Sequence, residues 1–185
     1  LAGGRPTIAL KAAPQKLQLV PPLTGQPFSY AKTVQPIWNK HCVSCHAPGM
    51  KAEKIDLTDR EVRDAPERGP SRDTTRRRFF QSYLTLLHVK PRNNHFGPGL
   101  DQGRSNKWVN YFTRLATTEL TPPYYAGSIK SGLITMLQKG HEKVKLSKRE
   151  IKTVAAWIDL NVPFIGEYDE MNDWHASEIK LFKDK

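Results

Sequence analysis

The chain is poor in cysteine. Cys42 and Cys45 are its only two cysteines in 185 residues. A structural zinc site usually takes four cysteine or histidine ligands, often as two paired clusters. A cysteine-rich zinc site is therefore disfavoured, although two distant histidines could complete one.

The chain also lacks long apolar runs and several catalytic signatures. No segment approaches the roughly 18 consecutive apolar residues that a membrane-spanning helix needs. The first ten residues have no basic region followed by a long apolar stretch, so they do not look like a signal peptide. We find no internal repeat, no paired carboxylates, no Ser/His/Asp arrangement and no glycine-rich phosphate loop. These absences disfavour an integral membrane protein and several common hydrolase and nucleotide-binding chemistries.

The composition predicts one domain with short helices. Hydrophobic residues make up 38% and charged residues 25% of the chain, which is ordinary for a protein with polar loops. Fourteen prolines and twelve glycines predict many connections. Residues 1–28 are rich in proline, so we expect an extended arm or linker there, followed by a single domain over residues 29–185.

The net charge is strongly positive. Lys and Arg number 29 against 18 Asp and Glu, which gives +11. The densest run is Arg72, Arg76, Arg77 and Arg78, which is either a solvated segment or a docking site for an acidic redox partner. No nucleic-acid-binding motif accompanies the charge, so nucleic acid is disfavoured as a partner.

The most specific motif is Cys42-Val43-Ser44-Cys45-His46. It has the C-x-x-C-H pattern of covalent c-type haem attachment. Two thiols add to the two vinyl groups of one haem, the two-residue spacer lets both reach one porphyrin edge, and the histidine can bind the iron. With this motif the chain resembles c-type cytochromes. The resemblance implies one covalent haem c held by Cys42 and Cys45, with His46 as an axial ligand.

Two other interpretations of the cysteine pair are weaker. A thioredoxin-like redox pair also reads C-x-x-C, but it is expected in a βαβ setting. Nothing near Cys42 indicates a strand followed by a long helix. A plain disulfide would leave His46 without a role.

Apolar residues at helical spacing predict the elements. A helix capped by Ser29 should run to His41, with a kink or a late start at Pro36. It would deliver Cys42, and Trp38 one turn earlier would pack either on the haem edge or in the core. Further helices are expected after a capping pair at Thr58 and Glu61, over Arg76–His88, from Ser128 to Gly140, from the Ser147–Glu150 capping box to Asn161, and over Ala176–Lys183. The predicted fold is mainly α: a cytochrome-c-like single-haem domain of four to five short helices with long loops.

Further motifs follow one another along the second half of the chain. They are Gly127-Ser128, Leu133, Leu137, Lys139-Gly140-His141, Val144, Leu146-Ser147 and Trp157 to Pro163. With Val34-Gln35-Pro36, they resemble the haem-binding C-terminal region of hydrazine-synthase-alpha-like proteins, a group common in planctomycetes. The resemblance covers residues 13–174 in patches. Members of that group often carry a β-propeller, and the synthase subunit has more than one haem. This sequence contains one C-x-x-C-H and no propeller, so the resemblance implies a domain type and a haem but not hydrazine synthesis.

The second axial ligand decides what such a haem can do. His141 is the predicted ligand, because it follows Gly140 at a helix end and belongs to the Lys-Gly-His element. The runners-up are His95, His88 and Met50. Weaker candidates are His41, His175, Met136 and Met171, and an open sixth site is a further alternative.

Two functions are consistent with these features. The first is electron transfer by one haem c, as a carrier or as the cytochrome subunit of a larger complex, without enzymatic activity. The second is a haem enzyme or small-ligand sensor with an open or weak sixth site. Haem c is attached outside the cytoplasm, so we expect a periplasmic or other extracytoplasmic location. We also expect the numbering to start after a cleaved leader or inside a longer chain.

Overall fold

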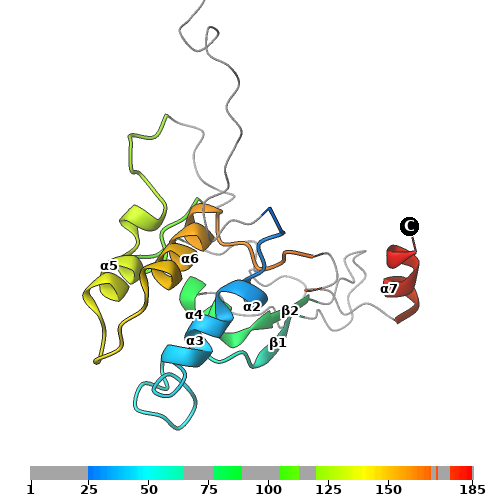
Figure 1. Ribbon diagram of the computed structural model, residues 1–185, viewed down its shortest axis with the longest axis horizontal. Coiled ribbons are helices and arrows are strands. Elements are labelled where there is room, and N and C mark those ends of the chain that lie inside the picture. The colour runs from blue at the N-terminus through cyan, green and yellow to red at the C-terminus, as the bar shows by residue number, and fades with distance from the viewer. Residues whose placement is uncertain are drawn as a thin grey trace, which may run out of the picture.

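The computed structural model describes residues 25–64, 77–88, 105–112, 120–167, 170 and 176–184. This part of the chain is mainly helical, as predicted, with one small sheet (Figure 1). Most of the proline-rich arm, residues 1–24, lies outside the described residues, and the division into arm and domain stays a prediction. Within the described ranges, no helix is both long enough and apolar enough to cross a bilayer.

The first helical segment is divided into two. Helix α2 spans Tyr30–Thr33 and helix α3 spans Gln35–His41, with Val34 between them. The Ser29 hydroxyl accepts a hydrogen bond from the Lys32 amide, 3.3 Å away, and so caps α2 as predicted. Pro36 stands in the first turn of α3, where its missing amide hydrogen leaves no bond unmade. The predicted interruption at Pro36 is confirmed.

A two-stranded antiparallel sheet follows. Strand β1, Glu61–Asp64, pairs with strand β2, Arg77–Phe80, so that Val62 lies opposite Phe79. The predicted brief helix at Thr58 and Glu61 is therefore wrong. Both the amide and the hydroxyl of Thr58 donate to Asp56, at 2.9 and 2.7 Å, and Glu61 enters the sheet. Local hydrogen bonding and strand pairing thus override the capping pattern.

The predicted helix over Arg76–His88 is also too long at its start. Helix α4 spans Gln81–Leu87, because Phe79 and Phe80 belong to β2. Aromatic residues favour strands when one face is buried, and Phe79 is only 4% exposed. His88 ends the helix in a left-handed conformation, with φ 54°.

The second half of the chain forms a short 3₁₀ helix and two α-helices. Helix η2 spans Ser128–Lys130, α5 spans Gly132–Lys139 and α6 spans Lys148–Asp159. Ser131, not Ser128, stands at the N-cap of α5. The amide and hydroxyl of Ser128 donate instead to the Asp159 carboxylate, at 2.7 and 2.8 Å, which joins η2 to the end of α6.

Most of the other predicted helix boundaries are confirmed, although α6 ends at Asp159 rather than at the predicted Asn161. Gly140 ends α5 with φ 84°. Ser147 and Glu150 form a complete capping box on α6. Helix α7 spans Ala176–Lys183, and it lies apart from the other helices (Figure 1).

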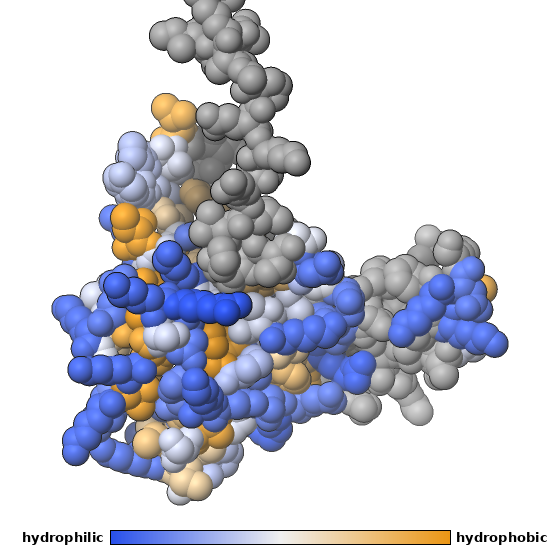
Figure 2. All heavy atoms as spheres, viewed as in Figure 1, coloured by the Kyte–Doolittle hydropathy of each residue, from blue (hydrophilic) through white to orange (hydrophobic). Residues whose placement is uncertain are grey.

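An aromatic centre holds α2, α4 and α6 together. The ring of Tyr30 lies 5.2 Å from both Tyr83 and Trp157, and 5.8 Å from Phe164, measured between ring centroids. Trp38 donates its indole N–H to the Tyr30 hydroxyl at 3.0 Å, and that hydroxyl donates to Ser82 at 2.9 Å. Fully buried aromatic rings with satisfied polar groups make a rigid core. The visible face outside it is mostly hydrophilic (Figure 2).

Candidate functional site

The Cys42–His46 motif forms a compact turn at the end of α3. The amides of Cys42 and Val43 both donate to the Trp38 carbonyl, at 2.8 and 3.0 Å. The amides of Cys45 and His46 then donate to the Cys42 carbonyl, at 3.0 and 2.9 Å. Backbone hydrogen bonds therefore fix the turn to helix α3, which buries the side chains of Gln35, Ile37 and Trp38.

Both cysteines are free thiols. Cys42 is partly buried, and Cys45 is exposed. Burial, with a smaller contribution from the neighbouring Cys45, raises the pKa of the Cys42 thiol to about 11. A redox-active cysteine pair depends on a lowered thiol pKa. The environment of Cys42 therefore disfavours a thioredoxin-like pair and leaves two reduced thiols separated by two residues.

His46 has a defined ring orientation. Its Nδ1 lies 3.1 Å from the Ile55 carbonyl oxygen. A carbonyl only accepts hydrogen bonds, so this contact needs the proton on Nδ1, which leaves the lone pair on Nε2. Histidines that bind metals commonly fix their tautomer by donating the other ring N–H in this way. His46 is therefore arranged to offer Nε2 to a metal.

His141 lies next to His46, although the two are 95 positions apart in the chain. It follows Gly140 at the end of α5 and opens a tight turn, in which its backbone exchanges hydrogen bonds of 3.2 and 2.8 Å with Val144. The ring centroids of His46 and His141 are 6.0 Å apart, and the rings are inclined by 37°. A metal ion bound by two imidazoles at about 2.0–2.1 Å on opposite sides holds their ring centres roughly 6 Å apart. The separation also lies within the range of a direct aromatic contact.

The residues present therefore fit a covalently bound haem c. Cys42 and Cys45 would carry the haem through their thiols, and His46 and His141 would offer imidazole ligands to its iron. Among the described residues, no three or more His, Cys, Asp or Glu side chains gather into a cluster suited to a metal ion.

The other predicted ligand candidates are not brought to His46 by any described contact. His88 is exposed at the end of α4, and Met50 is 49% exposed in the turn after the motif. Met136 packs against the core from α5. His41 contacts a carboxylate instead, as described below. His95, Met171 and His175 lie outside the described residues.

Trp38 is a core residue. It is 1% exposed, and its indole is bonded to Tyr30. Its carbonyl anchors the cysteine turn, so it supports the site through its backbone. Contact of its ring with a haem edge stays a prediction.

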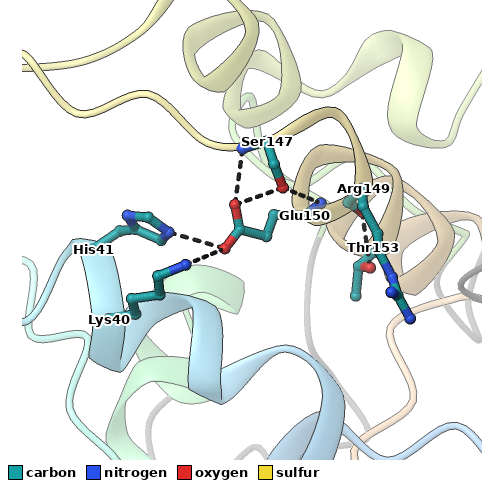
Figure 3. A network of polar contacts seen from close by, with 6 residues as sticks. All are labelled: Lys40, His41, Ser147, Arg149, Glu150 and Thr153. Atoms are coloured by element: carbon teal, nitrogen blue, oxygen red, sulfur yellow. Dashed lines mark hydrogen bonds and ion pairs between the residues drawn. The ribbon is translucent and has the colours of Figure 1, made fainter.

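A carboxylate links the cysteine turn to α6, and the sequence analysis did not find this contact. One Glu150 oxygen lies 2.9 Å from His41 Nε2 and 3.2 Å from Lys40 Nζ, at the end of α3. The other accepts from the Ser147 amide and hydroxyl, at 2.8 and 2.7 Å (Figure 3). The capping box could be recognised from sequence, but the contact with His41 joins residues 109 positions apart. It depends on how α3 and α6 pack, and no local pattern encodes that.

The hydrogen bonds to Glu150 lower the pKa of its carboxyl from 4.5 to about 2. The bond from His41 is the largest cause, followed by those from the Ser147 amide and hydroxyl. Glu150 is therefore ionised throughout the neutral range, and it carries the negative charge that Lys40 and a protonated His41 would face.

The arginine run is only partly described. Arg72 and Arg76 lie outside the described residues, and Arg77 is described by its place in β2 alone. Arg78 lies with its guanidinium 3.8 Å from the Glu61 carboxylate across the sheet. Docking of an acidic partner at this run stays a prediction.

Comparison with known proteins finds no matching family, no similar curated protein and no similar solved structure.

Proposed function

We propose that this chain is a c-type cytochrome domain that transfers electrons through one haem. In this proposal Cys42 and Cys45 carry the haem, and His46 and His141 bind its iron. The single observation that carries it is the pairing of His46 with His141 beside the two thiols, with ring centres 6.0 Å apart. The hydrogen bond from His46 to Ile55 adds support, because it leaves Nε2 for the iron.

The proposed chemistry follows from the two ligands. When bound, a haem whose iron has two strong ligands supplies one-electron transfer rather than substrate activation. The chain's own contribution is to fix the orientation of the His46 imidazole, to hold His141 beside it, and to present the exposed Cys45 at the surface. The aromatic centre supports α3 through the hydrogen bond from Trp38 to Tyr30.

The haem motif suggests the compartment in which the domain works, and the net charge suggests the kind of partner. We place the domain in the periplasm or another extracytoplasmic compartment, where haem c is attached. Its partner would be an acidic redox protein or the remainder of a larger complex, since the chain has a net charge of +11. The ordered motifs from Gly127 to Pro163 resemble those of the haem domains of hydrazine-synthase-alpha-like proteins, and this resemblance supports the proposed domain type.

A second candidate function rests on the turn that carries His141. Glu142 and Lys143 both have positive φ, 49° and 69°. Residues other than glycine adopt this backbone conformation at an energetic cost. His141 itself is exposed. A ligand on such a turn could leave the iron, which would give a weak sixth site able to bind small molecules, as in a haem sensor or enzyme.

The experiment that tests the proposal measures covalent haem directly. The chain is expressed in a host with haem c maturation, beside a Cys42→Ala/Cys45→Ala variant. Under denaturing conditions the wild-type mass should exceed the mass of the bare chain by one haem, and its pyridine haemochrome should be of c type. The double variant should run at the bare mass. A wild-type chain at the bare mass would rule out the proposal.

A further inference from the structure

Two segments carry the candidate iron ligands: one follows α3 and the other precedes α6. The Glu150 side chain contacts the helix end next to each segment. His46 stands five residues after His41, at the end of α3. His141 stands six residues before Ser147, at the start of α6. Glu150 contacts His41 with one carboxylate oxygen and Ser147 with the other (Figure 3).

We propose that Glu150 is a positioning residue for the pair His46 and His141. This inference rests on the proposed function. Glu150 lies in the first turn of α6, and by contacting His41 it fixes the end of α3 against the start of α6. This contact sets the separation of the two segments that carry His46 and His141 before the iron binds.

Helix capping alone does not account for this arrangement. A capping box needs a glutamate that accepts from the N-cap amide, and a single oxygen of Glu150 does this. The other oxygen faces α3, where it meets both His41 and Lys40. His41 and Glu150 are well shielded, with 18% and 20% of their side chains exposed, whereas Lys40 is 67% exposed. The contact with His41 is therefore the stronger link between the helices, because exposed ion pairs contribute little.

A second contact joins the same two segments but is too exposed to fix them. Lys51 Nζ lies 3.2 Å from Glu142, and these side chains are 77% and 62% exposed. Solvent and salt screen such a pair. Of these two polar contacts, the one through Glu150 is the better shielded from solvent.

The test uses carbon monoxide binding to the ferrous holoprotein. Carbon monoxide can bind only when His141 leaves the iron, so its rate reports how firmly His141 is held. His41→Ala removes the better-shielded contact with α3, leaves the exposed contact with Lys40, and leaves the capping box intact. Glu150→Gln keeps a capping side chain but removes the charge. Ser147→Ala is the matched control, because it weakens the cap of the same helix and leaves the contact between Glu150 and His41.

We expect His41→Ala and Glu150→Gln each to speed carbon monoxide binding by about three- to ten-fold, the scale of one partly shielded charged contact. The double variant should be no faster than the larger single effect, because both changes remove one interaction. Ser147→Ala should lower the melting temperature and leave the rate within about two-fold of wild type, since a lost cap affects helix stability. If Glu150→Gln cannot be purified as a folded protein, the carbon monoxide rate of His41→Ala is sufficient for the test.

The outcomes separate this inference from the proposed function. A low-spin wild type whose carbon monoxide rate is unchanged in His41→Ala would overturn the role of Glu150 and leave the bis-histidine haem standing. Equal acceleration in His41→Ala and Ser147→Ala would overturn it too, because general loosening of α6 would then explain the effect. A wild type without haem would overturn both proposals.

Discussion

Tyr30 connects Trp38, which anchors the cysteine turn, to the rest of the core. Its hydroxyl accepts from Trp38 and donates to Ser82, and its ring contacts Tyr83 and Trp157. Burial raises the pKa of Tyr30 above its usual range, so the hydroxyl keeps its proton. The side chain therefore acts as a neutral link between α2, α3 and α4.

Tyr30→Phe should destabilise the fold. The change leaves the Trp38 indole N–H without its acceptor in a closed site, which costs about 1–3 kcal/mol. Urea unfolding at neutral pH measures this difference. Tyr125→Phe is the control, because Tyr125 is 52% exposed and its loss should change the free energy of unfolding by less than about 0.5 kcal/mol. Equal stability of Tyr30→Phe and wild type would contradict the role given to this hydroxyl.

The lowered pKa of Glu150 predicts that part of the free energy of unfolding depends on pH in the acidic range. Its folded pKa, about 2, lies below its usual 4.5. A lowered carboxyl pKa stabilises the fold above pH 4.5, and this contribution is lost as the pH falls from 4.5 towards 2. Urea unfolding of wild type and Glu150→Gln at several pH values should show a modest difference at pH 6 that shrinks below pH 4.5. A difference that does not change over this range would contradict the ion-paired state of Glu150.

At the scale of elements, the turn between α5 and α6 determines the position of His141. Gly140 has φ 84° and ψ 152°, a region open almost only to glycine. A Cβ there would lie 3.3 Å from the Val144 carbonyl oxygen, which is also the acceptor for the His141 amide. The turn that presents His141 therefore depends on glycine at position 140.

Gly140→Ala should destabilise the protein by about 1–3 kcal/mol, the usual cost of forcing a side chain into such a conformation. It should also raise the high-spin fraction of the ferric haem, because the strain falls on the residue before His141. Thermal unfolding and electron paramagnetic resonance report the two effects. Lys139→Ala, one residue earlier on α5, should leave both unchanged. A Gly140→Ala protein with wild-type stability would show that the turn tolerates a side chain.

The elements differ in how far local sequence determines them. The caps at Ser29 and Ser147, the stop at Gly140 and the interruption at Pro36 were predictable, because each depends on residues within one turn of it. Glu61 and Phe79 were misassigned, since a strand forms only when a distant partner pairs with it. The same limit applies to the candidate site. The cysteine motif is local, whereas the nearness of His141 to His46 and the link from Glu150 to His41 depend on how α3, α5 and α6 pack.

At the scale of the whole molecule, the positive charge should govern encounters with redox partners. A net charge of +11 attracts negative partners over a distance that salt reduces to about 8 Å at physiological ionic strength. If the arginine run guides docking, its removal should slow encounter without altering the haem.

Electron exchange with small anionic and cationic metal complexes tests this charge effect. The reduced protein should react faster with the anionic complex, and that rate should fall several-fold between low salt and physiological salt. Arg72→Glu/Arg76→Glu should reduce the rate with the anionic complex more than Lys180→Glu/Lys183→Glu, which reverses the same number of charges on α7. Rates independent of salt would favour a solvated arginine segment over a docking site.

The central claim is that His46 and His141 bind one iron from opposite faces. The most direct measurement is the spin state of the ferric protein by electron paramagnetic resonance, in wild type, His141→Ala and the exposed-histidine control His88→Ala. Two imidazoles should give low-spin iron in wild type and His88→Ala, without the near-infrared band of a methionine ligand, and high-spin iron in His141→Ala. A His141→Ala protein that stays low-spin would contradict the claim and make His95→Ala the next variant. A high-spin wild type that binds carbon monoxide freely would replace the electron carrier with a haem sensor or enzyme.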